Sequence, residues 1–380
     1  MSYQVVEKKE EEVLKYMIFI EPNFVAIGKT NGIISIYDIF EKKQIFSGKF
    51  CNGTITYLLI HKKEKNTYLI SCSDEPVIVV SDITPLISKY YNFQSSQTIP
   101  STIYSNFHKS CIKKIEYINN DNFASCSLDG TIMNINFINK RCNPIIIDNT
   151  GIENFCIIFK KNSLDNIITL NKKCVLSFYI EYNGKFYLKK IILDIDYTNS
   201  NSLKKIKDKL HIGGYKFLQI ISIKEMEIIA RIKLENPISF IYNSSNGLTN
   251  NFLIFGLKNG KLEFLDKNKF NKLKNDKIVE IEKKNINFKF SNIMENENII
   301  LFENKPIISF EIFEDKLICI SDNYIKIYEK CKINKISPIN TINSINAINN
   351  KKVNSGFFNY FSSLLNVLKE NHIYDKNYKF

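Results

Sequence analysis

Three residues in one short segment could carry out hydrolytic chemistry: His108, Ser125 and Asp129. A serine hydroxyl, an imidazole and a carboxylate serve many hydrolases as nucleophile, general base and orienting acid. In one large class of these enzymes the serine lies in a G-x-S-x-G turn. No such turn surrounds Ser125, whose neighbours are Ala124 and Cys126. These residue types alone therefore do not indicate a hydrolase, and we expect no catalytic residues.

Other sites that bind a metal or a cofactor leave no pattern in this chain. The four histidines, at positions 61, 108, 211 and 372, are far apart, and neither an HxxxH nor a CxxC pair occurs. No G-x-x-x-x-G-K-[ST] segment is present, so no phosphate-binding loop of that kind is predicted. Acidic residues are abundant, but nothing singles out a pair for acid–base chemistry. We therefore predict no metal and no cofactor.

The segment 107–137 shows which elements hold the three candidate residues. After His108 comes an apolar alternation through Ile112, Ile115 and Tyr117, followed by a polar Asn-Asn-Asp-Asn turn. A strand of small residues, a Ser-Leu-Asp-Gly turn and a second alternating strand complete the unit. Strands that alternate around tight turns predict an antiparallel sheet.

A similar hairpin recurs along the chain. Its marker is a tight turn followed by a strand that ends in an aromatic or apolar residue and then an acidic one. Five copies end at Tyr37-Asp38, Ser81-Asp82, Ile135-Asn136, Leu265-Asp266 and Tyr328-Glu329, and two degenerate copies span 167–179 and 210–223. The aligned residues Ile132, Val175, Phe217 and Leu262 are 43, 42 and 45 positions apart. That period is typical of a four-stranded propeller blade.

Seven hairpins result from this alignment. They span 24–37, 67–82, 122–137, 166–179, 209–223, 252–265 and 316–328. Two steps are longer than the others: we expect 84–106 to form a loop, and 267–304 to form an insertion or a ragged strand pair. An eighth, eroded blade in the second region is a less favoured alternative.

The segment 107–137 resembles a WD40 repeat, and the repeats at 24–37 and 316–328 carry further matches. The resemblance implies an all-β fold, a seven-bladed WD40-like β-propeller over residues 1–335. It also implies that His108, Ser125 and Asp129 form a structural hydrogen-bond network, in which Ile135 replaces the usual tryptophan. Tyr37, Asp38, Asp266 and Tyr328 stand at the repeat-end positions.

A propeller ring must be closed, because an open ring exposes strand edges. Members of this family close by lending a strand from one terminus to the blade formed by the other. Tyr3–Val6 and Lys332–Ile339 are both candidates, and the sequence does not decide between them.

The net charge of +13 raises the question of nucleic-acid or anionic-membrane binding. Only Arg141 and Arg231 among the 52 basic residues are arginines, and the lysines are dispersed. Specific phosphate recognition favours the planar arginine fork, so solubility and weak, salt-sensitive attraction are the favoured interpretation. Phosphoinositide-binding propellers use adjacent arginines within one blade; none are adjacent here, so this ligand is not expected.

The cysteines and the N-terminal segment indicate the compartment. Nine cysteines form no CxxC pair, and Cys72, Cys126, Cys156 and Cys319 lie in apolar strand patterns. This is typical of a reducing compartment, cytoplasmic or nuclear. The N-terminus has no apolar core for a signal peptide, and no run of about 18 apolar residues predicts a transmembrane helix.

A polar, Asn-rich connector (336–354) precedes a predicted amphipathic helix over 355–371, followed by a tail (372–380). Its apolar stripe consists of Phe357, Phe358, Phe361, Leu364, Leu365 and Leu368. Three docking sites remain open for this stripe: the propeller itself, a groove on a partner protein, or a membrane surface. A protein groove is preferred over a membrane, because the polar face of the helix is poor in lysine and arginine.

These features favour a non-enzymatic protein–protein interaction scaffold in a multiprotein complex. The alternative is a nucleic-acid-associated propeller, in ribosome assembly or chromatin. An enzyme on a propeller is the third hypothesis, and polar residues converging on the central channel would be its structural sign.

Overall fold

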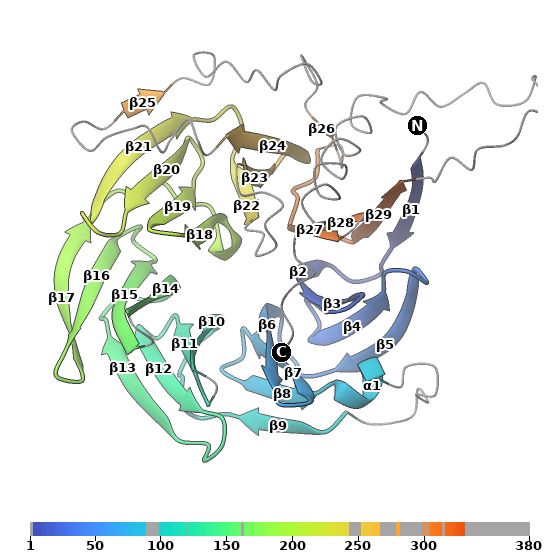
Figure 1. Cartoon of the computed structure of the whole chain (residues 1–380), viewed down its shortest axis with the longest axis horizontal. Helices are drawn as coiled ribbons and strands as arrows, with labels where there is room; N and C mark the ends of the chain where they lie inside the picture. Colours follow the sequence, from blue (N-terminus) through green and yellow to red (C-terminus); the bar gives the residue numbers. More distant parts are fainter. Residues whose placement is uncertain are drawn as a thin grey trace, which may run out of the picture.

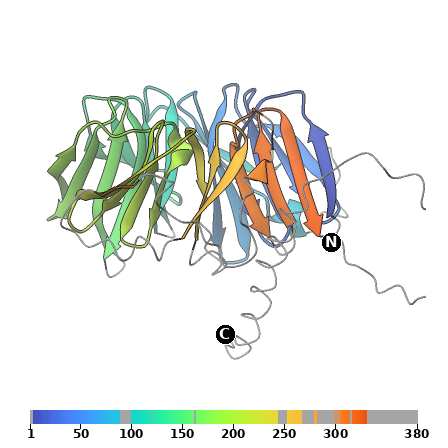
Figure 2. The same cartoon turned by 90° about the horizontal axis from the view of Figure 1, so that it is seen from above.

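The protein folds into a ring of seven β-sheets that stand radially around one axis (Figure 1). A computed structural model describes residues 3–88, 99–119, 121–160, 163–242, 252–266, 279–281, 299–300, 302, 304–313 and 316–330. Seen edge-on, the ring is a flat disc (Figure 2). The predicted seven-bladed β-propeller is confirmed.

The first four blades each use four strands that are consecutive along the chain and run from the axis to the rim. Blade 1 contains β2 (Leu14–Ile20), β3 (Phe24–Lys29), β4 (Ile33–Asp38) and β5 (Lys43–Lys49). Blade 2 contains β6 (Ile55–Lys63), β7 (Asn66–Ser73), β8 (Ile78–Asp82) and β9 (Ser101–Tyr104). Blade 3 contains β10 (Ile112–Asn119), β11 (Asn122–Ser127), β12 (Thr131–Asn136) and β13 (Cys142–Ile147). Blade 4 contains β14 (Ile152–Lys160), β15 (Ser163–Asn171), β16 (Leu176–Tyr182) and β17 (Lys185–Ile192).

The last three blades depart from this simple order. Blade 5 contains β18 (Leu203–Ile206), β19 (Lys209–Gly213), β20 (Phe217–Ser222) and β21 (Glu227–Lys233), and β25 (Val279–Ile281) adds a fifth strand parallel to β21. Blade 6 contains β22 (Ile238–Tyr242), β23 (Phe252–Leu257), β24 (Lys261–Asp266) and β26 (Ile299–Ile300). Blade 7 contains β27 (Ser309–Phe313), β28 (Lys316–Ser321), β29 (Tyr324–Lys330) and, outermost, β1 (Tyr3–Lys9).

The second and third strands of every blade coincide with the seven predicted hairpins. Their turns are set by short polar side chains that accept backbone N–H groups. In blade 3 the Oδ1 of Asp129 accepts the N–H of Thr131 at 2.9 Å, and in blade 1 the Oδ1 of Asn31 accepts that of Ile33 at 3.1 Å. Gly130 follows with φ +86°, and a side chain there would strike the carbonyl of Asp148.

The N-terminal strand closes the ring. β1 pairs antiparallel with β29 along its whole length, from Tyr3 opposite Lys330 to Lys9 opposite Tyr324. The N-terminal candidate is therefore confirmed, in a strand longer than the predicted Tyr3–Val6. The other candidate, Lys332–Ile339, lies outside the described residues.

The expectation that 84–106 forms only a loop is wrong. The short helix α1 (Thr84–Ser88) buries Leu86, and β9 pairs with β8 as the outer strand of blade 2. The strand escaped detection because it lies at the rim: of its four residues only Tyr104 is buried, so its apolar alternation is weak. In 267–304, the described strands β25 and β26 join blades 5 and 6, and no eighth blade occurs in the described residues.

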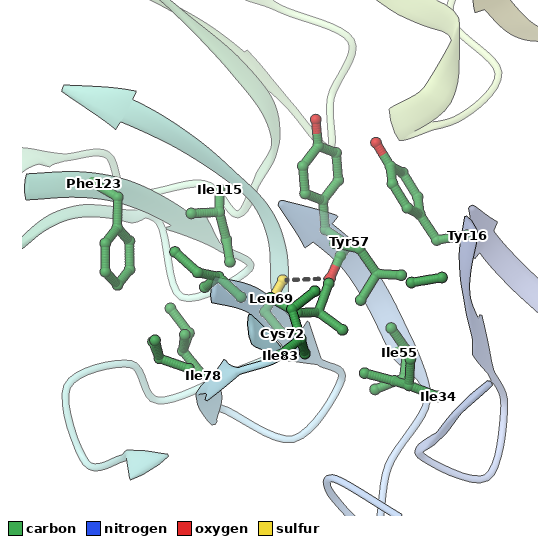
Figure 3. Packing of buried hydrophobic residues seen from close by; sticks show 14 of the residues in the cluster. Tyr16, Ile34, Ile55, Tyr57, Leu69, Cys72, Ile78, Ile83, Ile115 and Phe123 are labelled. Atoms are coloured by element: carbon green, nitrogen blue, oxygen red, sulfur yellow. Dashed lines mark hydrogen bonds between the residues drawn. The ribbon is translucent and has the colours of Figure 1, made fainter. Parts of the chain in front are cut away.

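The hydrophobic core lies between the blades. In the largest cluster, side chains from blades 1, 2 and 3 interlock, including Ile34, Ile55, Leu69 and Ile115, each fully buried (Figure 3). Burial of each such side chain contributes roughly 1.5–3 kcal/mol before ordering costs. Because every blade packs on two neighbours, the disc is a rigid support for the side chains at its axis and its rim.

The predicted helix over 355–371, with its six apolar residues, lies outside the described residues, as do the connector 336–354 and the tail 372–380. Docking of that helix stays a prediction.

Candidate functional site

The structure brings His108, Ser125 and Asp129 together. The His108 Nε2 is 2.8 Å from the Ser125 hydroxyl in β11, and its Nδ1 is 3.1 Å from Asp129 Oδ2 in the following turn. The Thr131 hydroxyl joins this group, 2.9 Å from His108 Nδ1 and donating to Asp129 Oδ1 at 2.7 Å. The backbone N–H of Lys109 donates to Asp129 Oδ2 at 2.7 Å. These bonds tie the segment before β10 to the turn between β11 and β12.

The electrostatics of this group suit a structural role. Burial lowers the pKa of His108, although Asp129 has the opposite effect. The lowered pKa favours the neutral imidazole at pH 7. Burial alone would raise the pKa of Asp129, but the hydrogen bonds from Thr131 and Lys109 hold it below its ordinary value. The side chain of His108 and the whole of Ser125 have no exposed surface, so no substrate reaches this serine.

Among the repeat-end residues, Asp38 fixes a turn, whereas Asp266 and Tyr328 are placed by backbone pairing. Asp38 is buried, and its Oδ1 accepts the N–H groups of Phe40 and Glu41 at 2.7 and 3.0 Å, which fixes the turn between β4 and β5. Asp266 ends β24, where its backbone pairs with Phe252. Tyr328 lies within β29, where its backbone pairs with Leu317.

Tyr37 belongs to a network that the sequence did not predict, here named the closure joint: Lys8, Glu10, Lys29, Tyr37 and Gln44. The Lys29 ammonium donates to Glu10 Oε2 at 2.7 Å, and the Tyr37 hydroxyl donates to Glu10 Oε1 at 2.6 Å. Lys8 of the closing strand contacts Glu10 Oε1 at 2.9 Å. Burial opposes ionisation of Glu10, but the hydrogen bonds from Lys29, Tyr37 and Lys8 lower its pKa to about 2. The joint therefore fastens β1 to blade 1 through one buried, fully partnered carboxylate.

Polar side chains also gather on the innermost strands. In five blades the strand has a one-residue irregularity after its first residue, and the residue that follows it is Tyr16, Tyr57, Lys114, Asn154 or Phe240. Such bulges re-aim side chains. Tyr16 and Tyr57 stand side by side with ring centroids 4.5 Å apart (Figure 3). Burial raises the pKa of both phenols, so both stay neutral donors.

Lys114 is the most completely satisfied member of this group. Its ammonium forms a 2.6 Å ion pair with Glu116 and donates to the Asn154 side chain at 3.0 Å and to the Phe155 carbonyl at 2.6 Å. Burial would lower its pKa, but Glu116 raises it. Glu116 also accepts the backbone N–H of Ile157 at 2.8 Å. Lys114 and Glu116 together join blade 3 to blade 4.

Lys204, on the innermost strand of blade 5, has a different environment. Its ammonium lies 5.8 Å from the centroid of the Phe240 ring, with no ion pair or hydrogen bond to any other described residue. Burial and, to a smaller extent, the nearby charge of Lys114 lower its pKa to about 8, although Glu116 and Glu311 oppose the shift. We name Lys114, Glu116, Lys204 and Glu311 the axial cluster, because each comes from an innermost strand.

Exposed apolar side chains concentrate on the rim of blade 4. Of the twelve large hydrophobic residues that are exposed in the described chain, five fall within 182–193. They are Tyr182, Tyr187, Leu188, Ile191 and Leu193, which are 47–67% exposed. The strand β17 that carries three of them has no hydrogen-bonded neighbour on its outer side among the described residues.

No protein-family model matches the chain, and no curated protein matches it. The fold is therefore established by the arrangement of the strands. Among the described residues, no three His, Cys, Asp or Glu residues gather to hold a metal ion. Within the same residues no helix has the length and apolar character needed to cross a membrane.

Proposed function

We propose that this protein is a WD40-like, non-enzymatic scaffold that binds protein partners within a larger complex. Propellers commonly serve this purpose, because a rigid disc presents two faces and a rim on which loops and strand edges are held in place. The observation that carries the proposal is the exposed apolar rim of blade 4. Several exposed apolar side chains gathered on one part of a folded domain are typical of an interaction site.

The occupant that fits this rim is an extended acidic segment of a partner protein. The outer edge of β17 has no backbone partner among the described residues, and the strand carries Lys185, Lys189 and Lys190 with no acidic residue of its own. Lys190 pairs with Glu227 at 2.8 Å, which leaves Lys185 and Lys189 for an acidic segment. An extended peptide can add to such an edge by main-chain hydrogen bonds, while its side chains pack against the apolar residues between the lysines. The adjacent blade supports the principle, because its outer strand β21 already accepts the extra parallel strand β25.

The polar groups of the described chain support a non-enzymatic role. Ser125 is buried within the His108 network, and Glu116 is already engaged by Lys114 and Ile157. Glu311 accepts a hydrogen bond from Tyr242 at 2.8 Å. Polar residues that converge on the central channel would indicate an enzyme, but the carboxylates of Glu116 and Glu311 act as structural hydrogen-bond acceptors. We place the scaffold in the cytoplasm or nucleus; the free state of all eight described cysteines supports a reducing compartment.

The test compares complexes purified from the native cell. We expect the double substitution Leu188→Lys and Ile191→Lys to reduce co-purification of a specific partner at least tenfold. The matched control, Ile103→Lys with Ile147→Lys, changes residues that are 63% and 73% exposed on the rims of blades 2 and 3 and should leave the partner bound.

Chemical crosslinking should then join Lys189 to an acidic segment of that partner. A synthetic peptide of the segment should bind the purified wild-type protein and the control, but not the blade 4 variant. Equal partner recovery from both variants would contradict the proposal. Salt-sensitive recovery of RNA or DNA, with no acidic protein segment at β17, would favour the nucleic-acid alternative.

A further inference from the structure

Lys204 is a cation on an innermost strand that lacks an anion among the described residues. Charged side chains inside proteins are normally paired, because an isolated charge loses its hydration without compensation. The recorded neighbour of the Lys204 ammonium is the Phe240 ring, at 5.8 Å. The aromatic face offers a weak attraction at this distance, and the three N–H donors have no acceptor among the described residues.

The carboxylates of the axial cluster do not neutralise Lys204. Glu116 lies 2.6 Å from the Lys114 ammonium and forms an ion pair with it. Glu311 accepts from the Tyr242 hydroxyl at 2.8 Å and acts on Lys204 only over a longer range. Lys205, the next residue, donates to the Ile157 carbonyl at 3.1 Å. Once Lys114 is balanced by Glu116, Glu311 is the remaining carboxylate of the axial cluster, and it is engaged by the Tyr242 hydroxyl.

We propose that Lys204 binds the carboxylate of a ligand that approaches along the axis of the ring. The inference goes beyond the proposed function, because it concerns the innermost strands and not the rim. A monoanionic carboxylate matches the single charge of Lys204, whereas the dianionic form of phosphate would bring a second negative charge close to Glu116 and Glu311. The side chain of Lys204 is half-buried, so part of it remains in contact with solvent and a small acid can reach it.

The electrostatics agree with this assignment. A lysine with a pKa of about 8 is about nine-tenths protonated at pH 7, so it offers a positive charge. A bound carboxylate stabilises the protonated form and replaces the hydration that burial removed. Binding should therefore raise the pKa of Lys204 and raise the stability of the folded state in proportion to ligand occupancy.

The test measures thermal unfolding of the full-length protein at pH 7 and constant ionic strength, with sodium acetate replacing sodium chloride. We expect Tm to rise and saturate with acetate for the wild type. The same curve is expected for the control Lys216→Met, which changes an exposed lysine in the turn between β19 and β20. Lys204→Met should lose the acetate-dependent rise, and Lys204→Arg, which keeps the charge, should retain it. The far-ultraviolet circular dichroism of each variant establishes that it folds.

Further arms separate the sources of the carboxylate. If a blocked Gly-Glu-Gly tripeptide saturates at lower concentration than acetate, the group belongs to a partner chain; if acetate is equal or better, a free acid is the ligand. Phosphate at matched ionic strength should give a smaller rise. A rise that persists in Lys204→Met, an acetate effect no larger than that of chloride, or saturation by phosphate at a lower concentration than acetate would overturn the proposal. None of these outcomes depends on the rim of blade 4.

Discussion

The closure joint and the axial cluster are both built from lysines and glutamates, but they leave their charges in opposite states. At the joint, Glu10 meets Lys29, Lys8 and Tyr37, all within 2.9 Å. On the axis, Lys204 meets no carboxylate at such a distance among the described residues. The pKa of Glu10 falls to about 2, because its partners overcome burial, whereas that of Lys204 falls to about 8, because nothing overcomes burial.

This difference separates a charge that holds the fold from one that remains available to a ligand. A buried charge with all its partners fixes two elements in one geometry, here β1 and blade 1. Removing that charge leaves its partners buried and unpaired. A charge without such partners, as at Lys204, contributes little to the stability of the ring. It stabilises the folded protein only when an anion binds to it. Substitutions should therefore have large effects on stability at the joint and small ones at Lys204.

The largest effect is expected from Glu10→Gln. The amide keeps the shape of the side chain but leaves Lys29 buried without its counter-ion, which should lower the free energy of unfolding by roughly 3–5 kcal/mol. Urea denaturation measures this loss. The matched control Glu11→Gln removes an exposed charge one residue away and should change stability by less than about 0.5 kcal/mol. If both substitutions lowered the free energy of unfolding equally, Glu10 would contribute no more to stability than a surface glutamate.

The same carboxylate predicts a pH dependence. The pKa of Glu10 is lower in the folded protein than its ordinary value of 4.5, so the folded state binds fewer protons between these values. Its contribution is complete above pH 4.5 and is lost as the pH falls toward 2. The stability of Glu10→Gln should show a correspondingly smaller fall over this range.

A smaller loss is expected from His108→Ala. It breaks the bonds to Ser125 and Asp129, and leaving these buried groups unpaired costs about 1–3 kcal/mol. The control Lys109→Ala keeps the backbone N–H that Asp129 accepts, so it should unfold like the wild type. Because burial lowers the pKa of His108, its presence should make the protein less stable as the pH falls below about 6.5, and the alanine variant should lack this slope. If the His108→Ala protein melted at the same temperature as the wild type, the structural role of His108 would be contradicted.

The sequence predicted the parts of the fold that repeat. The inner strands alternate strongly around Asx and glycine turns, as at Asp129 and Gly130, so all seven central hairpins were found in place. Rim strands bury one side at most, and β9 was therefore missed. The sequence left two candidate segments for ring closure. It could not decide between them, because pairing between β1 and β29 joins residues more than 300 positions apart.

The two charged regions could not be predicted, for a similar reason. Nothing local in the sequence distinguishes Glu10 from Glu11 and Glu12, or Lys204 from Lys205. Their difference arises only when the ring brings distant strands together, as when Lys29 and Tyr37 surround Glu10. The His108 contacts were anticipated through the WD40 resemblance, because their members recur at fixed places within one repeat.

The most direct test of the central claim is the pKa of Lys204 in the folded protein. Brief acylation across a range of pH, followed by mass spectrometry of the Lys204 peptide, gives the pH at which half of its ammonium is deprotonated. The account predicts a midpoint near 8 in the folded protein, an upward shift on addition of acetate, and the ordinary lysine value of about 10.5 after unfolding in urea. A folded-state midpoint of about 10.5, unchanged by acetate, would show that Lys204 keeps the hydration of an ordinary lysine and does not bind a carboxylate, and would contradict the account.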